Sequence, residues 1–240
     1  MSKSRRRLRQ PPLPSRADPP ADPETISREH LGRLRACLDA VDPARIAAVA
    51  AHLGGVVRAG GLILTAGNGG SATTASHMAL DLGKSTLGRP PDRALRRVRT
   101  VSLADPSAVL TAWANDEGYE GVFAEQVAAL ARPGDALVLL SVSGTSPNVL
   151  AAARTARAKG ASVIALVGAH PGPLGALADF TVSVPSDDYG IVEDVHLAIN
   201  HILTKCLRDA LHSPAPAKAS RSRRPRPLAR TTVERTPSGR

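Results

Sequence analysis

The sequence predicts an α/β fold: a single domain, an αβα sandwich, in which helices flank a five-stranded parallel sheet and extra helices precede it. Two observations lead to this prediction. Five short apolar runs have the length and the continuous hydrophobicity of strands buried in a parallel sheet. They alternate with longer segments whose apolar residues recur at a helical period, an order typical of a parallel sheet covered on both faces. With 240 residues, the chain is long enough for one such domain with a full core.

The elements can be assigned in order along the chain. Two helices are expected first, at 25–40 and 43–58, and Asp42 and Pro43 suit the cap and the first position of the second helix. Apolar runs predict strands at 61–66, 98–103, 136–141, 162–167 and 179–184. Helical periodicity predicts helices at 71–82, 106–114, 118–131, 147–159 and 190–211. Residues 83–97 are rich in Gly, Pro and Arg, and we expect them to form a loop over the active-site side.

A glycine-rich turn is the most informative feature of the sequence. Asn68, Gly69, Gly70 and Ser71 follow the first predicted strand and precede a predicted helix. The backbone N–H groups of such a turn and the dipole of the helix both favour an anion at this place. The turn is therefore a candidate phosphate site.

The helix after this turn also carries groups capable of chemistry. His77 and Asp81 are four residues apart, so both project from one helix face. An anion site and a histidine–carboxylate pair on one element indicate a phosphorylated substrate that reacts about one helix length from its phosphate.

A second polar turn supports this interpretation. Ser141, Ser143 and Ser146, with Gly144, stand where another apolar strand gives way to a helix, and Pro147 suits the first turn of that helix. Hydroxyl groups and turn amides can bind phosphate without a cationic side chain. Any one serine could equally be an ordinary helix cap, but two such turns at the carboxyl ends of parallel strands favour a ligand site.

The positive charge of the chain is concentrated at its two ends. Of the formal net charge of +10, residues 1–24 contribute +3 and residues 213–240 contribute +7, so the rest of the chain is neutral. Both ends lack periodic apolar residues and are predicted to be disordered tails. We prefer solvated tails to a contact with nucleic acid, and we expect no membrane partner because no apolar run reaches membrane length. Cys37 and Cys206 have the pattern of small core residues, and we expect a cytoplasmic protein.

Four stretches of the sequence carry a resemblance to a known family. They are 67–71 (GNGGS), 112–119 (AWANDEGY), 132–149 and 193–203 (EDVHLAINHIL). In order and spacing they resemble the sugar isomerase (SIS) family, specifically its phosphoheptose isomerase branch. The resemblance implies a SIS domain at 25–212 that converts sedoheptulose 7-phosphate to D-glycero-D-manno-heptose 7-phosphate through an enediol. It also implies a homotetramer with active sites at subunit boundaries.

The resemblance further implies a set of site residues. A probable Zn²⁺ would be bound by His77, Asp81, Glu193 and His201, with Asp81 and His201 also acting as base and acid. The substrate and its phosphate would be bound by Asn68, Gly69, Gly70, Ser71, Asn115, Asp116, Ser141, Ser143 and Ser146. For Asn115 and Asp116 an ordinary helix cap is an equal alternative. His196 could support a zinc ligand, but a core histidine is the preferred interpretation.

The sequence departs from the family at four positions. Asp81 and Glu193 stand where the family has Glu and Gln, and Ser85 and Gly190 stand where it often has Arg and Asp. These changes leave open an isomerase of another ketose phosphate, such as an octulose phosphate in antibiotic or glycoconjugate synthesis. A non-catalytic phosphosugar-binding regulator or adaptor is a further alternative, less favoured because all four proposed ligands can bind a metal.

The sequence also suggests how subunits would meet. We expect apolar residues of 43–58 and 190–208 to pack between subunits, because one sheet cannot cover so much apolar helix surface. In that arrangement His201 would serve a site whose Asp81 comes from a neighbouring chain.

Overall fold

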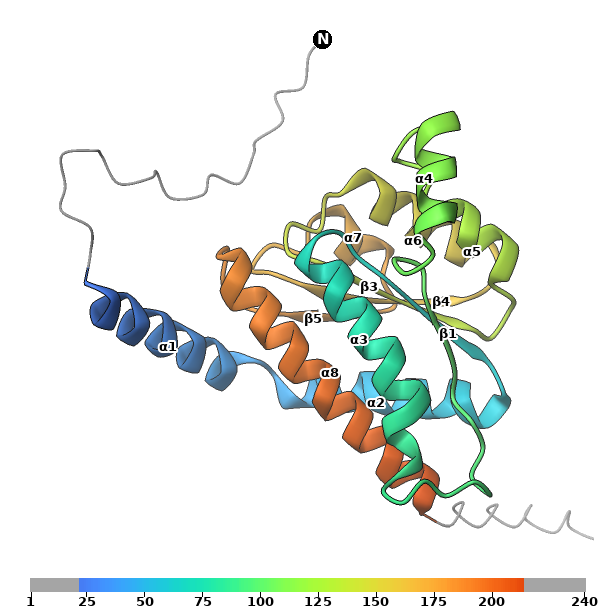
Figure 1. Ribbon diagram of the computed structural model, residues 1–240, viewed down its shortest axis with the longest axis horizontal. Coiled ribbons are helices and arrows are strands. Elements are labelled where there is room, and N and C mark those ends of the chain that lie inside the picture. The colour runs from blue at the N-terminus through green and yellow to red at the C-terminus, as the bar shows by residue number, and fades with distance from the viewer. Residues whose placement is uncertain (1–21, 214–240) are drawn as a thin grey trace, which may run out of the picture.

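A five-stranded parallel sheet forms the centre of the molecule (Figure 1). The computed structural model describes residues 22–213; most of both predicted tails, 1–21 and 214–240, lies outside the described residues. The strands are β1 (Leu62–Ala66), β2 (Arg99–Ser102), β3 (Ala136–Ser141), β4 (Ser162–Val167) and β5 (Phe180–Ser183). Their spatial order is β2-β1-β3-β4-β5, and each neighbouring pair is parallel. The predicted fold class is confirmed.

Helices cover both faces of this sheet. One face carries α2 (Pro43–Ala59), α3 (Gly70–Lys84) and α8 (Tyr189–His212). The opposite face carries α5 (Ala124–Leu130), α6 (Pro147–Ala158) and α7 (Gly172–Leu177). Figure 1 shows α1 (Pro23–Ala40) and α4 (Ser107–Asp116) extending beyond this body. The helix α1 begins two residues before its predicted start, and Asp22 caps it by accepting the Thr25 N–H.

The central strand β3 explains why the predicted strands are continuously apolar. Successive side chains of a strand point to opposite faces of the sheet. Val138 and Leu140 join the core under α2, α3 and α8, whereas Leu137 and Leu139 join the core under α5 and α6. Because helices cover both faces, every residue of β3 is buried.

The strand register brings the two polar turns together. Ala66, the last residue of β1, pairs with Leu139 of β3. The turns that follow β1 and β3 therefore lie side by side at the carboxyl edge of the sheet. This confirms the neighbourhood predicted for them, since parallel strands end at the same edge.

Two local predictions of secondary structure were wrong. A helix was predicted at 118–131, but the observed helix α5 is shorter and begins only at Ala124. The chain turns at Gly118, which has a φ of 91°. The short helix α7 was not predicted, since its Gly- and Pro-rich sequence resembles a loop. The loop predicted at 83–97 is present from Gly88 onward, whereas its first residues belong to the end of α3 and to the 3₁₀ turn η1 (Ser85–Leu87). This segment lies at the C-terminal end of α3, away from the glycine turn (Figure 1).

The faces predicted to pack between subunits are mostly buried within the chain. The reason is that α2 and α8 pack against each other and against the sheet. The buried residues are Ile46, Val49, Leu53, Val56, Val57, Ile191, Val195, Ile199 and Leu203. Of the predicted interface residues, Ile202 is exposed. Cys37 is buried as predicted, but Cys206 is exposed, so its assignment to the core was wrong.

Within residues 22–213, no single helix is both long and apolar enough to cross a membrane. The pair formed by α1 and α2 satisfies length and composition together, with a bend of 66° at the break between the helices.

Asp135 ties the start of β3 to its surroundings. Its carboxylate accepts the Leu62 N–H at 2.7 Å and the Arg132 N–H at 2.8 Å, and the residue is 5% exposed. We expect Asp135→Ala to lower the free energy of unfolding by about 2–4 kcal/mol, because two backbone N–H groups lose a charged acceptor. Urea denaturation measures this loss. The control is Asp39→Ala on the exposed side of α1, expected to change stability by less than about 0.5 kcal/mol; equal losses would contradict the assignment.

Candidate active site

The glycine turn between β1 and α3 has a geometry that only small residues permit. Gly69 has a φ of 57°, and a Cβ on Gly67 would lie 2.8 Å from Ser71 atoms. A Cβ on Gly70 would lie 2.1 Å from Glu193 Oε2. Gly69, at the cap position, has no side chain to bond the first turn of α3, and the Glu193 carboxylate accepts a hydrogen bond from the Ser71 backbone there. The start of a helix favours an anion at this place.

The serine turn between β3 and α6 faces the glycine turn. Gly144 has a φ of 61°, and a Cβ there would lie 2.1 Å from the Pro171 carbonyl oxygen. Two asparagines join the turns: the Asn68 amide donates to Asn148 Oδ1 and the Asn148 amide donates to Asn68 Oδ1, both at 2.9 Å. Tyr119 also donates its hydroxyl proton to Asn68 Oδ1 at 3.2 Å.

The two turns enclose a cavity of about 280 Å³. Seven of the nine residues predicted to bind substrate or phosphate line it: Asn68, Gly69, Gly70, Ser71, Ser141, Ser143 and Ser146. We call these seven residues the phosphate cradle. The other lining residues are Leu140, Val142, Tyr189 and Glu193. Among the described residues that line the cavity, only Glu193 carries a charged side chain, so the groups that could bind an anion here are N–H and O–H groups.

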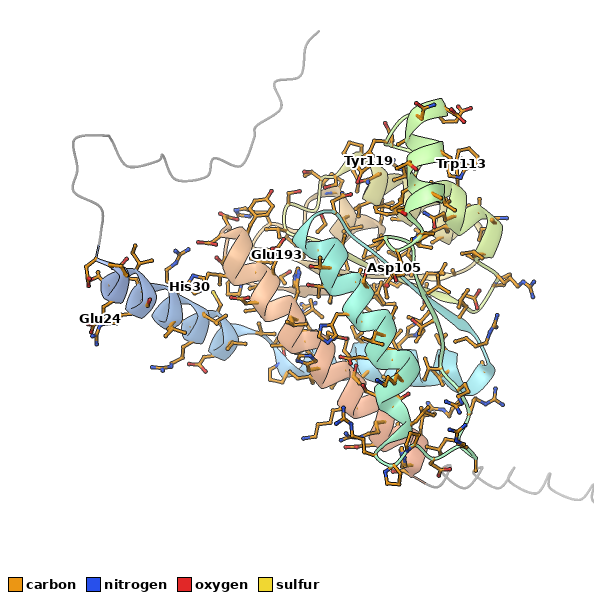
Figure 2. All side chains as sticks on the ribbon, viewed as in Figure 1. Glu24, His30, Asp105, Trp113, Tyr119 and Glu193 are labelled. Atoms are coloured by element: carbon orange, nitrogen blue, oxygen red, sulfur yellow. The ribbon has the colours of Figure 1, made fainter. Side chains whose placement is uncertain are left out.

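Glu193 lies where α8 meets the start of α3 (Figure 2). Burial raises the pKa of its carboxyl, the nearby charge of Asp194 raises it further, and a hydrogen bond from the Ser71 backbone lowers it. The structure therefore places this predicted metal ligand beside the phosphate cradle.

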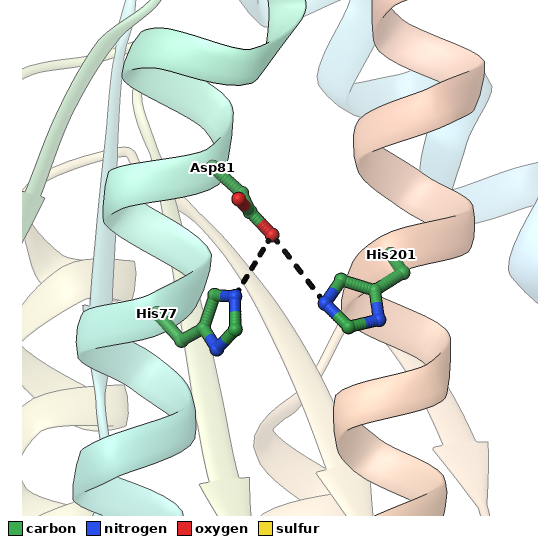
Figure 3. Close-up of side chains that lie close together, drawn as sticks. All are labelled: His77, Asp81 and His201. Carbon is green, nitrogen blue, oxygen red and sulfur yellow. Dashed lines mark ion pairs between the residues drawn. The ribbon is translucent and has the colours of Figure 1, made fainter.

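The other three predicted metal ligands come together further along the same two helices (Figure 3). The Nε2 atoms of His77 and His201 lie 3.3 and 3.7 Å from Asp81 Oδ2. The three ligand atoms lie within 4.8 Å of one another, and Glu193 is not part of this group. We call the three residues the His–Asp–His cluster. Asp81 and His201 therefore meet within one chain, contrary to the expectation that Asp81 reaches His201 from a neighbour.

The donor set of the cluster fits a zinc ion. Donor atoms bonded to tetrahedral zinc at about 2.0–2.2 Å lie about 3.3–3.6 Å from one another. The two distances from Asp81 Oδ2 are close to this range. The side chains of His77 and His201 are 42% and 54% exposed, which leaves one side of the cluster open to a further ligand. The cluster is a possible metal site, and its atoms do not specify which metal.

Further polar contacts surround the cluster. Asp81 Oδ1 accepts the Ser85 hydroxyl at 3.1 Å, and Asp81 Oδ2 accepts the Asn200 amide at 3.0 Å. His196 is fully buried, and its Nε2 lies 3.3 Å from the Val167 carbonyl oxygen. Burial lowers the pKa of His196 to about 4, so it is neutral at pH 7 and donates this hydrogen bond. The preferred interpretation of His196 as a core residue is confirmed.

Asn115 and Asp116 lie apart from both groups. They end the exposed helix α4, and the Asn115 amide donates to the Asp116 carboxylate at 2.7 Å. Neither lines the cavity of the phosphate cradle or belongs to the His–Asp–His cluster. Their predicted role in substrate binding stays a prediction.

Comparison with known proteins identifies the family. Residues 29–168 match the SIS domain, which is more than half of the chain. The chain belongs to the SIS domain family. It is 42% identical to a phosphoheptose isomerase of Rhodospirillum rubrum over 65% of this chain and 81% of that protein. It is 41% identical to a phosphoheptose isomerase of Mycobacterium tuberculosis over 65% of this chain and 78% of that protein.

Solved structures agree with this assignment. The phosphoheptose isomerase of Neisseria gonorrhoeae superposes on this SIS domain with a TM-score of 0.69 and 28% identity, covering 78% of this chain and 96% of the other. The resemblance inferred from the four stretches is confirmed. The relatives support an aldose–ketose isomerase acting on a phosphorylated sugar.

Some contacts of this SIS domain were missed in the sequence. Asn148 pairs with Asn68, Tyr119 joins the pair, and Tyr189 lines the cavity. The sequence does contain a signal for the contact of Asn148, because each polar turn has an asparagine in it or next to it. Asn68 lies in the glycine turn, and Asn148 closely follows the serine turn. Asn200 was missed although it is polar on the apolar side of α8, between Ile199 and Leu203. Tyr119 ends the stretch 112–119, but its contact with Asn68 was not predicted, and Tyr189 carries no comparable signal.

The raised pKa of Glu193 makes the stability of the SIS domain depend on pH. Because its pKa in the folded chain exceeds its ordinary value of 4.5, the native state takes up this proton more readily than the unfolded chain. Its contribution to stability is therefore lost as pH rises through the interval between the two pKa values. We expect Glu193→Gln to be more stable than wild type above this interval, with the difference vanishing below about pH 4.

Thermal unfolding over a pH series measures this difference. Glu120→Gln, at an exposed position, is the control and should follow the wild-type curve at every pH. A Glu193→Gln protein that is less stable than wild type at pH 7 would show that the carboxylate is favourably paired instead.

Proposed function

We propose that this protein is a metal-dependent isomerase that interconverts sedoheptulose 7-phosphate and D-glycero-D-manno-heptose 7-phosphate. One observation carries the proposal: the phosphate cradle, which has no cationic side chain, includes the start of α3, and the His–Asp–His cluster lies further along α3, where it packs against α8. The cradle suits a terminal phosphate, and the cluster suits a metal and proton transfer. The similarity to phosphoheptose isomerases supports the choice of substrate.

The residues present fit the chemistry of this reaction. The ketose loses a proton from C1 and gains one at C2, while a proton moves between the oxygens of these two carbons. We assign the carbon-bound proton to Asp81 and the oxygen-bound proton to His201. A bound zinc ion would polarise these oxygens as a Lewis acid. His77, Asp81 and His201 would hold it from one chain.

Distances support an active site made by two chains. At 1.5 Å per residue, Asp81 lies about 15 Å beyond Ser71 along the axis of α3, and a phosphate would sit before the start of that helix. The six carbon–carbon bonds of a heptose, at about 1.5 Å each, span at most about 9 Å. A heptose phosphate in one chain's cradle therefore falls short of the same chain's cluster.

We therefore propose that the cradle of one chain faces the His–Asp–His cluster of another, within a homotetramer. Glu193, which lies beside the cradle, would then approach the cluster of the partner and complete the predicted set of four ligands. Exposed apolar side chains on α1, α3 and α8 are available to such contacts; they are Ile26, Leu31, Leu38, Leu80 and Ile202. The predicted cytoplasmic location stays a prediction.

Two other functions are less well supported. An isomerase of a different ketose phosphate would use the same site, and Asp81 and Ser85 are the residues that would distinguish it. A regulator that only binds a phosphosugar has no need of the His–Asp–His cluster, whose close geometry therefore favours an enzyme.

The direct test is an NMR assay of the purified full chain with sedoheptulose 7-phosphate, with and without added zinc. We expect turnover that depends on zinc, about one zinc per chain, and no turnover of the dephosphorylated sugar. The variant His77→Ala/His201→Ala should bind almost no zinc, because two of the proposed ligands are lost. Ser27→Ala on the exposed side of α1 is the control. Zinc-free wild type that turns over the substrate at full rate would exclude the metal, and turnover of an octulose phosphate alone would change the substrate.

Mixed oligomers test the shared site. Chains with Ser141→Ala/Ser143→Ala lack two of the four serine hydroxyls of the cradle, and chains with His77→Ala/His201→Ala lack both histidines of the cluster. Each should be poorly active alone. Co-expressed in equal amounts, they should regain up to about a quarter of wild-type activity, since one cradle–cluster combination in four joins two intact halves. Confirmed mixed oligomers without any regain would place the cradle and the cluster of each active site in one chain.

A further inference from the structure

Asn200 is a buried amide that contacts the His–Asp–His cluster from behind. It lies on α8 next to His201, but its side chain points into the core, where the residue is fully buried. Its Nδ2 donates to Asp81 Oδ2 at 3.0 Å. This direction of the amide is the favourable one, because the alternative would place the amide oxygen against a carboxylate oxygen.

The amide oxygen of Asn200 contributes no hydrogen bond to the described fold. Asn200 Oδ1 is buried and has no hydrogen-bond partner among residues 22–213. A buried polar group without a partner destabilises a protein, so a leucine of similar size would suit the core better. The hydrogen bond that the Asn200 side chain does make is to the carboxylate of Asp81.

That contact fixes the orientation of the carboxylate. Asp81 Oδ1 is held by the Ser85 hydroxyl and Oδ2 by Asn200. With one donor on each oxygen, rotation of the carboxylate is restricted, and the remaining lone pair of Oδ2 faces the two imidazoles. Both donors are neutral, so they orient the carboxylate without adding a positive charge that would repel a cation.

We propose that Asn200 is a positioning residue that preorganises Asp81 as a ligand of a divalent metal. This inference rests on the proposed function, because it assigns a metal to the His–Asp–His cluster. Polar groups behind a ligand commonly change metal affinity by about 10–100-fold when they are lost. Ser85 supports the same carboxylate from the exposed side and contributes less, since water can replace its hydroxyl.

The experiment measures the zinc affinity of the purified full chain by competition with a chromophoric chelator. We expect Asn200→Leu to bind zinc about 10–100-fold more weakly than wild type. We also expect the metal-free variant to have an unchanged or higher Tm, because leucine removes the unpaired oxygen from the core. Asn200→Ala is a second variant with the same expected loss of zinc affinity, in case leucine is not accommodated.

The matched control is Thr204→Val, one helical turn further along α8. Thr204 is 7% exposed, and its hydroxyl also has no partner in the described part of the chain. This substitution changes a buried polar group of the same helix without touching Asp81, so zinc affinity should stay at the wild-type value. Wild-type zinc affinity in Asn200→Leu, or an equal loss in Thr204→Val, would overturn the inference and leave the proposed function intact. A wild-type protein that binds no zinc would overturn both.

Discussion

The packing of α3 against α8 is the contact on which both halves of the site depend. Near the start of the helices, the missing side chain of Gly70 lets Glu193 lie against the first turn of α3. Further along, Asp81 of α3 reaches Asn200 and His201 of α8. Buried side chains such as Met78 and Leu203 fill the space between these polar contacts and the sheet.

The two ends of α3 favour ligands of opposite charge. The N-terminal end offers N–H groups and hydroxyls, whose partial positive charges suit a phosphate. The cluster offers one carboxylate and two imidazoles, a donor set that suits a cation. The sheet edge sets the position of the first end, and α8 sets the position of the second. In one chain, the two parts of the proposed site are therefore further apart than a heptose can reach, which is the physical reason to expect a second chain.

Much of the fold could be predicted from the sequence, because the strands are apolar runs bounded by turns. The phosphate cradle was predictable for the same reason: Gly70 and Ser143 follow strands that must end at one edge. The position of Glu193 was not predictable from spacing alone. Eight residues separate it from His201, about 12 Å along a helix, which is too far for both to bind one ion within a chain. The sequence motif contains both Glu193 and His201, but it does not indicate whether the two residues belong to the same metal site or to the sites of different chains.

Asn200 shows a second limit of the sequence. In the pattern of α8 it is a polar residue on the apolar side of the helix, and its contact with Asp81 is visible only in the structure. The helix α7 and the turn at Gly118 were missed for a local reason, since Gly and Pro obscure short helices and positive φ angles cannot be read from periodicity. The apolar residues of α2 were assigned to subunit contacts because the sequence does not show how much of the sheet α8 leaves uncovered.

A crystal structure of the zinc-loaded protein, with anomalous scattering recorded at the zinc edge, tests the shared metal site most directly. We expect one anomalous peak per chain, within about 2.0–2.2 Å of donor atoms of His77, Asp81 and His201. We also expect a carboxylate oxygen of Glu193 from a neighbouring chain beside the same peak. Peaks that lie away from this cluster, or a cluster that faces solvent with no second chain near it, would contradict the proposed site.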